Sequence, residues 1–260
     1  MSDPDELVQE TRDGVAFLTI NRPQRRNALT NDLMRRLGEA IIAAGRDPEI
    51  RAVVLTGAGD KAFCAGADLT PGDTPFQPDF AQLRLPFADF LRAGKNSAVP
   101  IIGRINGACM AGGMGLLGVC DIAIAADTAR FGLPEVKIGI FPMQVVAVLR
   151  DRLPARVLAD LSYTGRLVGA AEALTLGLVS RVVPAADLDA ATDAVLADIR
   201  AASPVAIRRG RYALRAMETM SFDEMIAFAE TQVGPMIMTG DAREGLMAFN
   251  ERRRPAWPNR

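Results

Sequence analysis

The chain has 260 residues, of which 49% are hydrophobic and 23% charged, a composition typical of one globular domain, with or without a helical appendage. Its formal net charge of −1 excludes a general electrostatic attraction to nucleic acid or to an anionic membrane. The acidic amino terminus and the lack of a long apolar run argue against a signal peptide and a membrane span, so we expect a cytoplasmic protein.

Alternating strand-like and helix-like segments predict an α/β core. Thr30-Asn31-Asp32 is expected to cap a helix from about Leu33 to Arg46, because apolar side chains recur on one face there. The expected strands are short apolar runs at residues 15–20, 52–56, 101–105 and 122–125. Residues 70–86 are rich in proline and glycine and are predicted to form a mobile loop.

After about Val183 the pattern changes to consecutive helices, expected at residues 188–202, 205–217, 222–236 and 242–253. Asp241 is the expected N-cap of the last helix. We interpret residues 1–190 as a core and residues 191–260 as a C-terminal helical region, which together form one functional unit.

The chain contains no histidine and three cysteines. Without histidine, Ser-His-Asp and Cys-His nucleophilic centres and the common histidine-ligated metal sites are excluded. Cys64, Cys109 and Cys120 form no C-x-x-C pattern, and we interpret them as small buried hydrophobic residues. Acid–base chemistry near neutral pH must therefore come from carboxylates, lysine, cysteine, tyrosine or water.

Two segments carry the strongest functional signal. The first is the small-residue turn Phe63-Cys64-Ala65-Gly66-Ala67-Asp68-Leu69, and the second is the glycine-rich run from Asn106 through Phe131-Gly132-Leu133-Pro134-Glu135. Small residues of this kind let a backbone approach a ligand closely. Together the two segments resemble the crotonase superfamily, the enoyl-CoA hydratases and isomerases, and the resemblance extends over nearly the whole chain.

The resemblance implies a spiral of ββα repeats with a C-terminal helical region, assembled as a homotrimer or a dimer of trimers. It places the backbone N–H groups of Ala67 and Gly112 in an oxyanion hole for a thioester oxygen, where donors fixed in advance stabilise the developing charge. Glu135 is then the expected acid/base group. Its apolar neighbours are expected to raise its pKa toward neutrality by desolvation.

The resemblance also implies an acyl-CoA substrate, so that coenzyme A is part of the substrate and no separate cofactor is expected. Arg25 and Arg26 resemble a basic stretch near the nucleotide phosphates, which suits the planar guanidinium group. Further coenzyme contacts are expected from the backbone of the first turn, at Ala65, Asp68 and Leu69. Across a subunit boundary, they are expected from the last helix, at Phe249 and Arg252.

Gly115 stands where the family usually places a second glutamate. Hydration of a 2-enoyl thioester is served by two carboxylates around a water, whereas 3-enoyl to 2-enoyl isomerisation needs one base that removes a proton from C2 and returns it at C4. The sequence therefore favours isomerisation. Hydration in fatty-acid or branched acyl-CoA oxidation is the alternative, with decarboxylation or hydrolysis behind both. A catalytically silent acyl-CoA-binding homologue also stays open.

Two further features bear on these alternatives. Met143 and Gln144 stand where hydratases often carry small residues, so they could fill space and reshape the acyl pocket, and Gln144 could hold a water. For Met143, simple core packing is the favoured interpretation. Separately, residues 57–62 match the dinucleotide pattern G-x-G-x-x-A after a strand. That pattern requires a helix to begin there, and the chain continues instead into the small-residue turn, so a nicotinamide-dependent enzyme is the disfavoured alternative.

Overall fold

The computed structural model describes residues 5–70, 81 and 83–259. A six-stranded sheet has the order β1-β2-β3-β5-β7-β10, and all its strand pairs are parallel except β1 with β2. Its strands are β1 (Leu7–Arg12), β2 (Val15–Ile20), β3 (Ala52–Gly57), β5 (Ile101–Ile105), β7 (Ile122–Ala126) and β10 (Arg181–Val183).

A second sheet of four strands has the order β4-β6-β8-β9. Its strands are β4 (Ala62–Cys64), β6 (Ala108–Met110), β8 (Arg130–Gly132) and β9 (Leu167–Gly169). From β3 to β8 successive strands alternate between the two sheets. Helices α2 (Pro86–Lys95), α3 (Gly112–Gly118) and α4 (Met143–Leu149) follow the pairs β3/β4, β5/β6 and β7/β8. The expected α/β spiral of ββα turns is therefore present.

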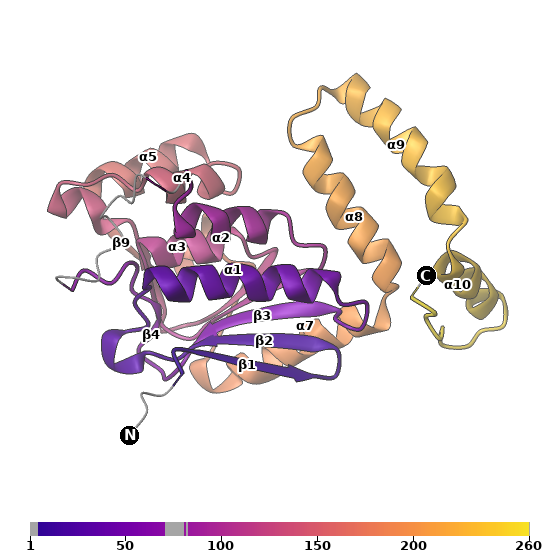
Figure 1. The fold of residues 1–260 in the computed structure, drawn as a ribbon, viewed down its shortest axis with the longest axis horizontal. Helices are drawn as coiled ribbons and strands as arrows, with labels where there is room; N and C mark the ends of the chain where they lie inside the picture. Colours follow the sequence, from indigo (N-terminus) through magenta and orange to yellow (C-terminus); the bar gives the residue numbers. More distant parts are fainter. Residues whose placement is uncertain (1–4, 71–80, 82, 260) are drawn as a thin grey trace.

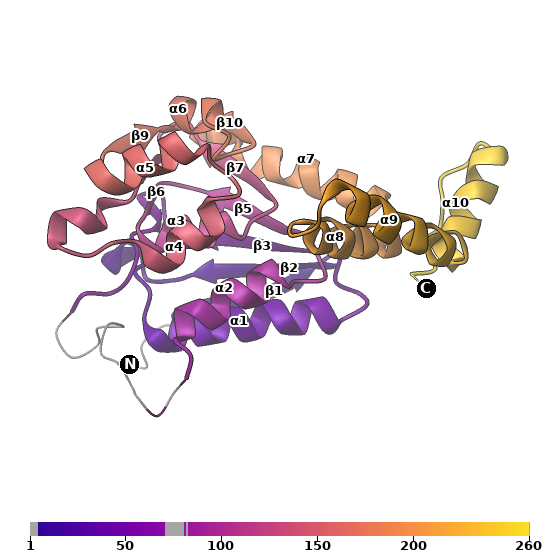
Figure 2. The same ribbon diagram turned by 90° about the horizontal axis from the view of Figure 1, so that it is seen from above.

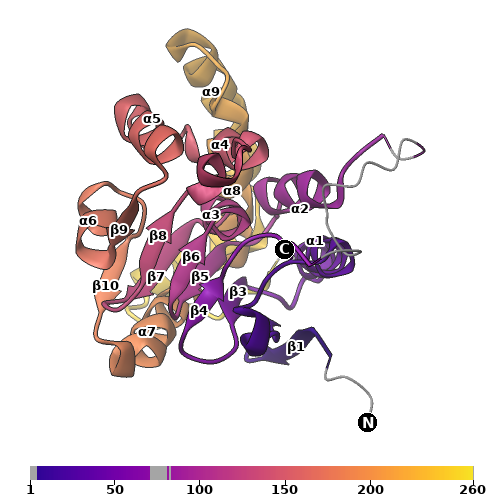
Figure 3. The same cartoon turned by 90° about the vertical axis from the view of Figure 1, so that its left-hand side faces the viewer.

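The six-stranded sheet is covered on both faces, as is usual for parallel sheets. Along β3, Val53 and Leu55 belong to the main core, whereas Ala52 and Val54 belong to a smaller cluster on the opposite face, because successive side chains of a strand alternate. Helices α1 (Asn31–Arg46) and α2 cover the first face, and α7 (Leu188–Ala201) covers the second (Figures 1 and 3). Helices α5 (Ala155–Thr164) and α6 (Ala170–Thr175) lie beside β9.

Three C-terminal helices extend away from the sheets: α8 (Pro204–Met217), α9 (Phe222–Ile237) and α10 (Gly240–Asn250) (Figures 1 and 2). Helix α9 buries no side chain within the chain, and large apolar side chains of all three helices are exposed. The division at residue 190 falls inside α7, which packs on the sheet, so the boundary between core and helical region stays a prediction.

The expected strands and the helix after Thr30 are confirmed, and the Thr30 hydroxyl accepts a hydrogen bond of 3.2 Å from the N–H of Leu33. Helix α2 was not predicted, and most of the predicted loop, residues 71–80 and 82, lies outside the described residues. The N-cap of α10 is Thr239, so the prediction of Asp241 was wrong. The buried Asp241 carboxylate instead accepts hydrogen bonds from Ser203 and Asn259.

Short 3-10 turns complete the chain at η1 (Pro23–Arg25), η2 (Pro134–Ile138) and η3 (Ala185–Asp187). After Gly57 and Gly59 the chain enters strand β4 where a dinucleotide-binding fold would begin a helix, which removes the nicotinamide alternative. The three cysteines are buried and free, as expected. Within the described part of the chain, none of the helices has the length and apolar character needed to cross a bilayer.

Candidate active site

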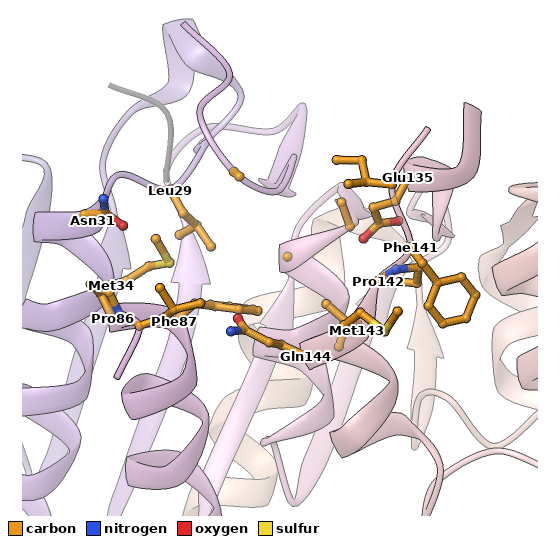
Figure 4. Close-up of a pocket in the computed structure, with 16 residues that line it drawn as sticks. Leu29, Asn31, Met34, Pro86, Phe87, Glu135, Phe141, Pro142, Met143 and Gln144 are labelled. Atoms are coloured by element: carbon orange, nitrogen blue, oxygen red, sulfur yellow. The ribbon is translucent and has the colours of Figure 1, made fainter. Parts of the chain in front are cut away.

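A cavity of about 310 Å³ opens where the N-terminal ends of helices α1 to α4 converge. The cavity is lined by the three residues expected to carry the chemistry, Ala67, Gly112 and Glu135. Figure 4 shows Leu29, Met34 and Phe87 on one wall and Glu135, Phe141 and Pro142 on the other. Most of the lining is apolar, which suits an acyl chain and strengthens electrostatic interactions inside.

Two backbone segments meet closely at the predicted oxyanion hole. A Cβ atom placed on Gly112 would lie 3.4 Å from Cα of Gly66 and 3.6 Å from the nitrogen of Ala67. Gly66 has a φ of +100°, and a Cβ there would lie 2.7 Å from Cβ of Ala111. Ala111 itself has a φ of +51°, which is costly for a residue with a side chain. Position 66 therefore requires glycine, whereas a Cβ at position 112 would meet its neighbours at ordinary van der Waals distances.

The N–H groups of Ala67 and Gly112 are available for a ligand. Gly112 is the first residue of α3, where backbone N–H groups lack a partner within the helix. Neither N–H donates a hydrogen bond to any residue in the described part of the chain. Both residues line the cavity, so their N–H groups stay candidates for the predicted oxyanion hole.

Buried asparagines hold the first turn in place. The side chain of Asn27 donates to the carbonyls of Ala58 (3.0 Å) and Ala62 (2.7 Å), and Asn106 donates to Ala62 (3.2 Å). The turn is also joined to the segment before α1, because Leu29 donates to the Gly66 carbonyl at 2.8 Å. Sequence reasoning assigned no role to the two asparagine side chains; the signal was their position beside turn segments, where asparagine bonds readily to backbone.

Glu135 lies in η2, directly after Pro134, and its carboxylate faces the cavity (Figure 4). Its Oε2 atom is buried and has no hydrogen-bond partner among the described residues. Burial raises the pKa of Glu135 above its ordinary value, while a hydrogen bond from its own backbone N–H lowers it by less. The expected upward shift is thus confirmed, and a carboxylate with a raised pKa is suited to accept and return a proton.

The position of the absent second glutamate is filled by an aromatic ring. A Cβ atom placed on Gly115 would lie 2.6 Å from Cζ of Phe87. Phe87 comes from α2, lines the cavity, and stacks on Phe90 with ring centroids 6.1 Å apart. Sequence reasoning missed Phe87, because the helix that carries it was not predicted.

Asp68 has a structural role that sequence reasoning also missed. Its buried carboxylate accepts hydrogen bonds from the Thr70 hydroxyl (2.6 Å) and from Arg22 (2.8 Å). The Thr70 bond is the largest contribution that lowers the pKa of Asp68 to about 2, and Arg22 adds to it. Arg22 also bonds Glu6 (2.8 Å) and the Ala28 carbonyl (2.6 Å), so it joins the first turn to the amino-terminal segment.

The residues expected to hold coenzyme A fall into two groups. Arg25 and Arg26 are exposed and form no ion pair with any described residue, and the Arg26 carbonyl accepts a hydrogen bond of 3.0 Å from Ala65. Leu69 follows the same turn and is exposed. Phe249 is exposed in α10, and Arg252 follows that helix; α10 lies far from the chain's own cavity (Figures 1 and 2). The structure thus brings the first group together and separates the second from the cavity.

Met143 and Gln144 begin helix α4 and line the cavity. The interpretation of Met143 as core packing was wrong, because its side chain is 71% exposed. Figure 4 shows the Gln144 side chain at the base of the cavity, between the two walls.

This geometry agrees with the similarity of the chain to known proteins. The sequence model described as "Enoyl-CoA hydratase/isomerase" matches residues 10–260. The chain belongs to this family. It is 39% identical to "Enoyl-CoA hydratase EchA19" of Mycobacterium tuberculosis, with 100% of this chain and 98% of that protein covered. It is 32% identical to "Short-chain-enoyl-CoA hydratase" of Clostridium acetobutylicum, with 96% and 98% covered.

Solved structures of the enoyl-CoA hydratase/isomerase family have the same fold. A structure described as enoyl-CoA hydratase of Mycobacterium smegmatis superposes with a TM-score of 0.91 at 33% identity, covering 98% of this chain and 99% of that chain. The protein is therefore an enzyme of this family with the crotonase fold. The names of these relatives favour the hydratase alternative over the isomerase that the sequence favoured.

Proposed function

We propose that this family member hydrates 2-enoyl-CoA thioesters, with Glu135 as its one acid/base group. The observation that carries the proposal is a buried carboxylate oxygen in the same cavity as two backbone N–H groups, all three without a hydrogen-bond partner among the residues that the structure describes. Full-length relatives named as hydratases support hydration as the reaction.

A single carboxylate is sufficient for the addition of water. The thioester oxygen binds at the N–H groups of Ala67 and Gly112, which draw electron density from C3 through the conjugated system. The water oxygen forms a bond to C3 while Glu135 takes one proton from the water, and the C2=C3 electron pair moves to the thioester oxygen as an enolate. Glu135 then returns its proton to C2, which completes the addition of H and OH to the double bond.

Isomerisation of 3-enoyl-CoA is the second candidate, and it is favoured by Gly115. It would use the same oxyanion hole, with Glu135 removing a proton from C2 and returning it at C4. The Phe87 ring fills the space beside Gly115, where a second carboxylate could otherwise hold a water. Isomerisation needs no bound water, so it loses no group to this ring.

Parallel assays of the purified protein on a 2-enoyl-CoA and a 3-enoyl-CoA series test both candidates. Loss of the conjugated thioester absorbance from the 2-enoyl series, abolished by Glu135→Gln and retained by the exposed control Glu10→Gln, is the expected result. If conjugated absorbance instead appears with the 3-enoyl series and the 2-enoyl series is not consumed, the activity is isomerisation and not hydration. Acyl-CoA binding without turnover of either series would overturn both and support a binding role.

We also propose that Arg25 and Arg26 hold the coenzyme phosphates, with backbone contacts from Ala65, Asp68 and Leu69. Because Phe249 and Arg252 lie far from the cavity of their own chain, they can reach coenzyme A only from a neighbouring subunit, as in a homotrimer or a dimer of trimers. Light scattering gives the mass of the assembly. A monomer that is fully active would exclude the contribution of Phe249 and Arg252.

A further inference from the structure

Gln144 is a polar side chain in the cavity that the proposed mechanism leaves unused. It is the second residue of α4, and its amide forms no hydrogen bond with any described residue. Among the described residues, the other polar side chains that line the cavity are Glu135 and Asn31, and Asn31 is the exposed first residue of α1 on the opposite wall (Figure 4). An amide without a partner in an apolar cavity has an unmet capacity for hydrogen bonds, which a ligand or water can satisfy.

Helix packing brings Gln144 level with Gly115. The N-terminal ends of α3 and α4 both line the cavity, through Gly112 and Gln144. The two helices also meet near their C-terminal ends, since a Cβ placed on Gly118 would lie 2.6 Å from Cγ2 of Val148. The two helices therefore run side by side in the same direction.

The spacing along each helix then places the remaining residues. Gln144 and Val148 share one face of α4, because residues three or four apart are neighbours on a helix. A Cβ on Gly118 would face α4, whereas a Cβ on Gly115 would face Phe87 and Leu91 of α2. Val148 lies against Gly118, so Gln144 lies one turn earlier along α4, at the level of Gly115. Figure 4 shows the Gln144 amide directed toward Phe87.

We propose that Gln144 positions the water that adds to C3, in place of the carboxylate that position 115 lacks. This inference rests on the proposed hydratase function. The amide oxygen accepts one hydrogen bond from the water, which directs a lone pair of the water oxygen toward C3. A neutral amide does not take up the proton, so the proton still passes to Glu135 and the balance of the reaction is unchanged.

The test separates water addition from proton transfer at C2. Gln144→Met keeps the size of the side chain and removes its hydrogen bonds, Gln144→Glu restores an acceptor, and Gln9→Met on the exposed strand β1 is the matched control. Each variant is assayed for hydration of a 2-enoyl-CoA, for affinity toward the saturated acyl-CoA, and for exchange of the C2 protons of that saturated thioester in D2O. This proton exchange needs the oxyanion hole and Glu135, but it does not involve the addition of water to a double bond.

Gln144→Met is expected to lower kcat for hydration by about 10- to 100-fold, the size of effect that misplacement of a reacting group produces. Affinity and C2 exchange are expected to change by less than about threefold, a split that a collapsed site would not produce. Gln144→Glu is expected to recover hydration, and Gln9→Met to behave as the wild type.

Unchanged hydration in Gln144→Met would overturn the role of Gln144 and leave the hydratase function intact. Equal losses of hydration, exchange and affinity, without recovery in Gln144→Glu, would also overturn it, because they would indicate a purely structural role. A wild-type protein that binds acyl-CoA and hydrates no 2-enoyl-CoA would overturn the function and the inference together.

Discussion

The phenyl ring of Phe87 occupies the space that a side chain at Gly115 would need, since a Cβ at 115 would lie 2.6 Å from Cζ of Phe87. Glycine at 115 and phenylalanine at 87 are thus a complementary pair across α3 and α2. Among the described residues, Glu135 is the carboxylate that lines the cavity, and the space beside position 115 is occupied by an apolar group. The choice between hydration and isomerisation depends on this replacement of a carboxylate by a phenyl ring. The proposed role of Gln144 depends on it as well.

Introducing the missing carboxylate should therefore require removal of the ring. Gly115→Glu alone is expected to lower the free energy of unfolding by about 1–3 kcal/mol, because the new side chain overpacks the site. Adding Phe87→Ala should recover part of this loss, with a favourable coupling of about 0.5–3 kcal/mol in a double-mutant cycle measured by urea unfolding. Additive effects of the two substitutions would contradict the pairing.

Glu135→Gln should separate activity from stability. Loss of the acid/base group is expected to lower turnover by about 10²–10⁴-fold. Burial raises the pKa of Glu135, so the ionised side chain destabilises the folded state, and stability falls as pH rises through the interval between the ordinary and the raised pKa. The variant should therefore have a higher Tm than the wild type near neutral pH.

The stability advantage of Glu135→Gln should disappear below about pH 4, where glutamate is protonated in both the folded and unfolded states. Thermal unfolding across this pH range measures it. The exposed Glu10→Gln should change neither turnover nor the pH dependence of Tm. Equal Tm values of Glu135→Gln and the wild type at neutral pH would show that the carboxylate is solvated.

Gly66→Ala tests the close approach of the two oxyanion segments. The new methyl group would lie 2.7 Å from Cβ of Ala111 and 3.2 Å from the nitrogen of Gly112, so the segment of Ala111 and Gly112 is expected to shift relative to the first turn. Turnover should fall by about 10²–10³-fold, the usual effect of losing one oxyanion donor. Gly14→Ala is a matched control, since Gly14 also has a positive φ of +71° and would contact the Glu49 carbonyl at 2.9 Å, far from the cavity. That control should lose stability and retain turnover.

Arg22→Met tests the ion pair between Arg22 and Asp68, which joins the first turn to the amino-terminal segment. It leaves the buried Asp68 carboxylate without its charged partner, which should lower the free energy of unfolding by about 3–5 kcal/mol. Arg35→Met, which breaks exposed pairs with Asp32 and Glu39, should cost less than about 1 kcal/mol. Urea unfolding of both variants at neutral pH measures the difference, and similar losses would indicate that the Arg22 pair is solvated.

Asp68→Asn should lower the free energy of unfolding at neutral pH, and the size of this loss should depend on pH. The lowered pKa of Asp68, about 2, means that its stabilising contribution is fully present above the ordinary pKa of aspartate and is lost as pH falls toward 2. The gap between the variant and the wild type should therefore narrow on acidification. A constant gap from neutral to acid pH would show that packing, and not charge, is responsible.

Much of the fold was predictable, because its signals are local. The cap at Thr30, the alternating burial along β3 and the amphipathic face of α1 each depend on residues a few positions apart. Where two neighbouring residues could both cap a helix, the sequence does not predict which of them does. Thr239 and Asp241 are both suitable N-caps, and contacts of Asp241 with the distant residues Ser203 and Asn259 decide the choice.

For the site, the sequence alone determined the family, the two small-residue turns, and the presence of Glu135 with no carboxylate at 115, because each of these is a matter of residue type at a particular position. Only the tertiary structure decided what surrounds them. The Phe87 ring at Gly115, the ion pair of Arg22 with Asp68 and the Gln144 amide at the base of the cavity come from segments far apart in the chain. Their contacts arise from the packing of α2 and α4 against α3 and from a loop docked on the first turn, and such long-range packing leaves no periodic pattern in the sequence.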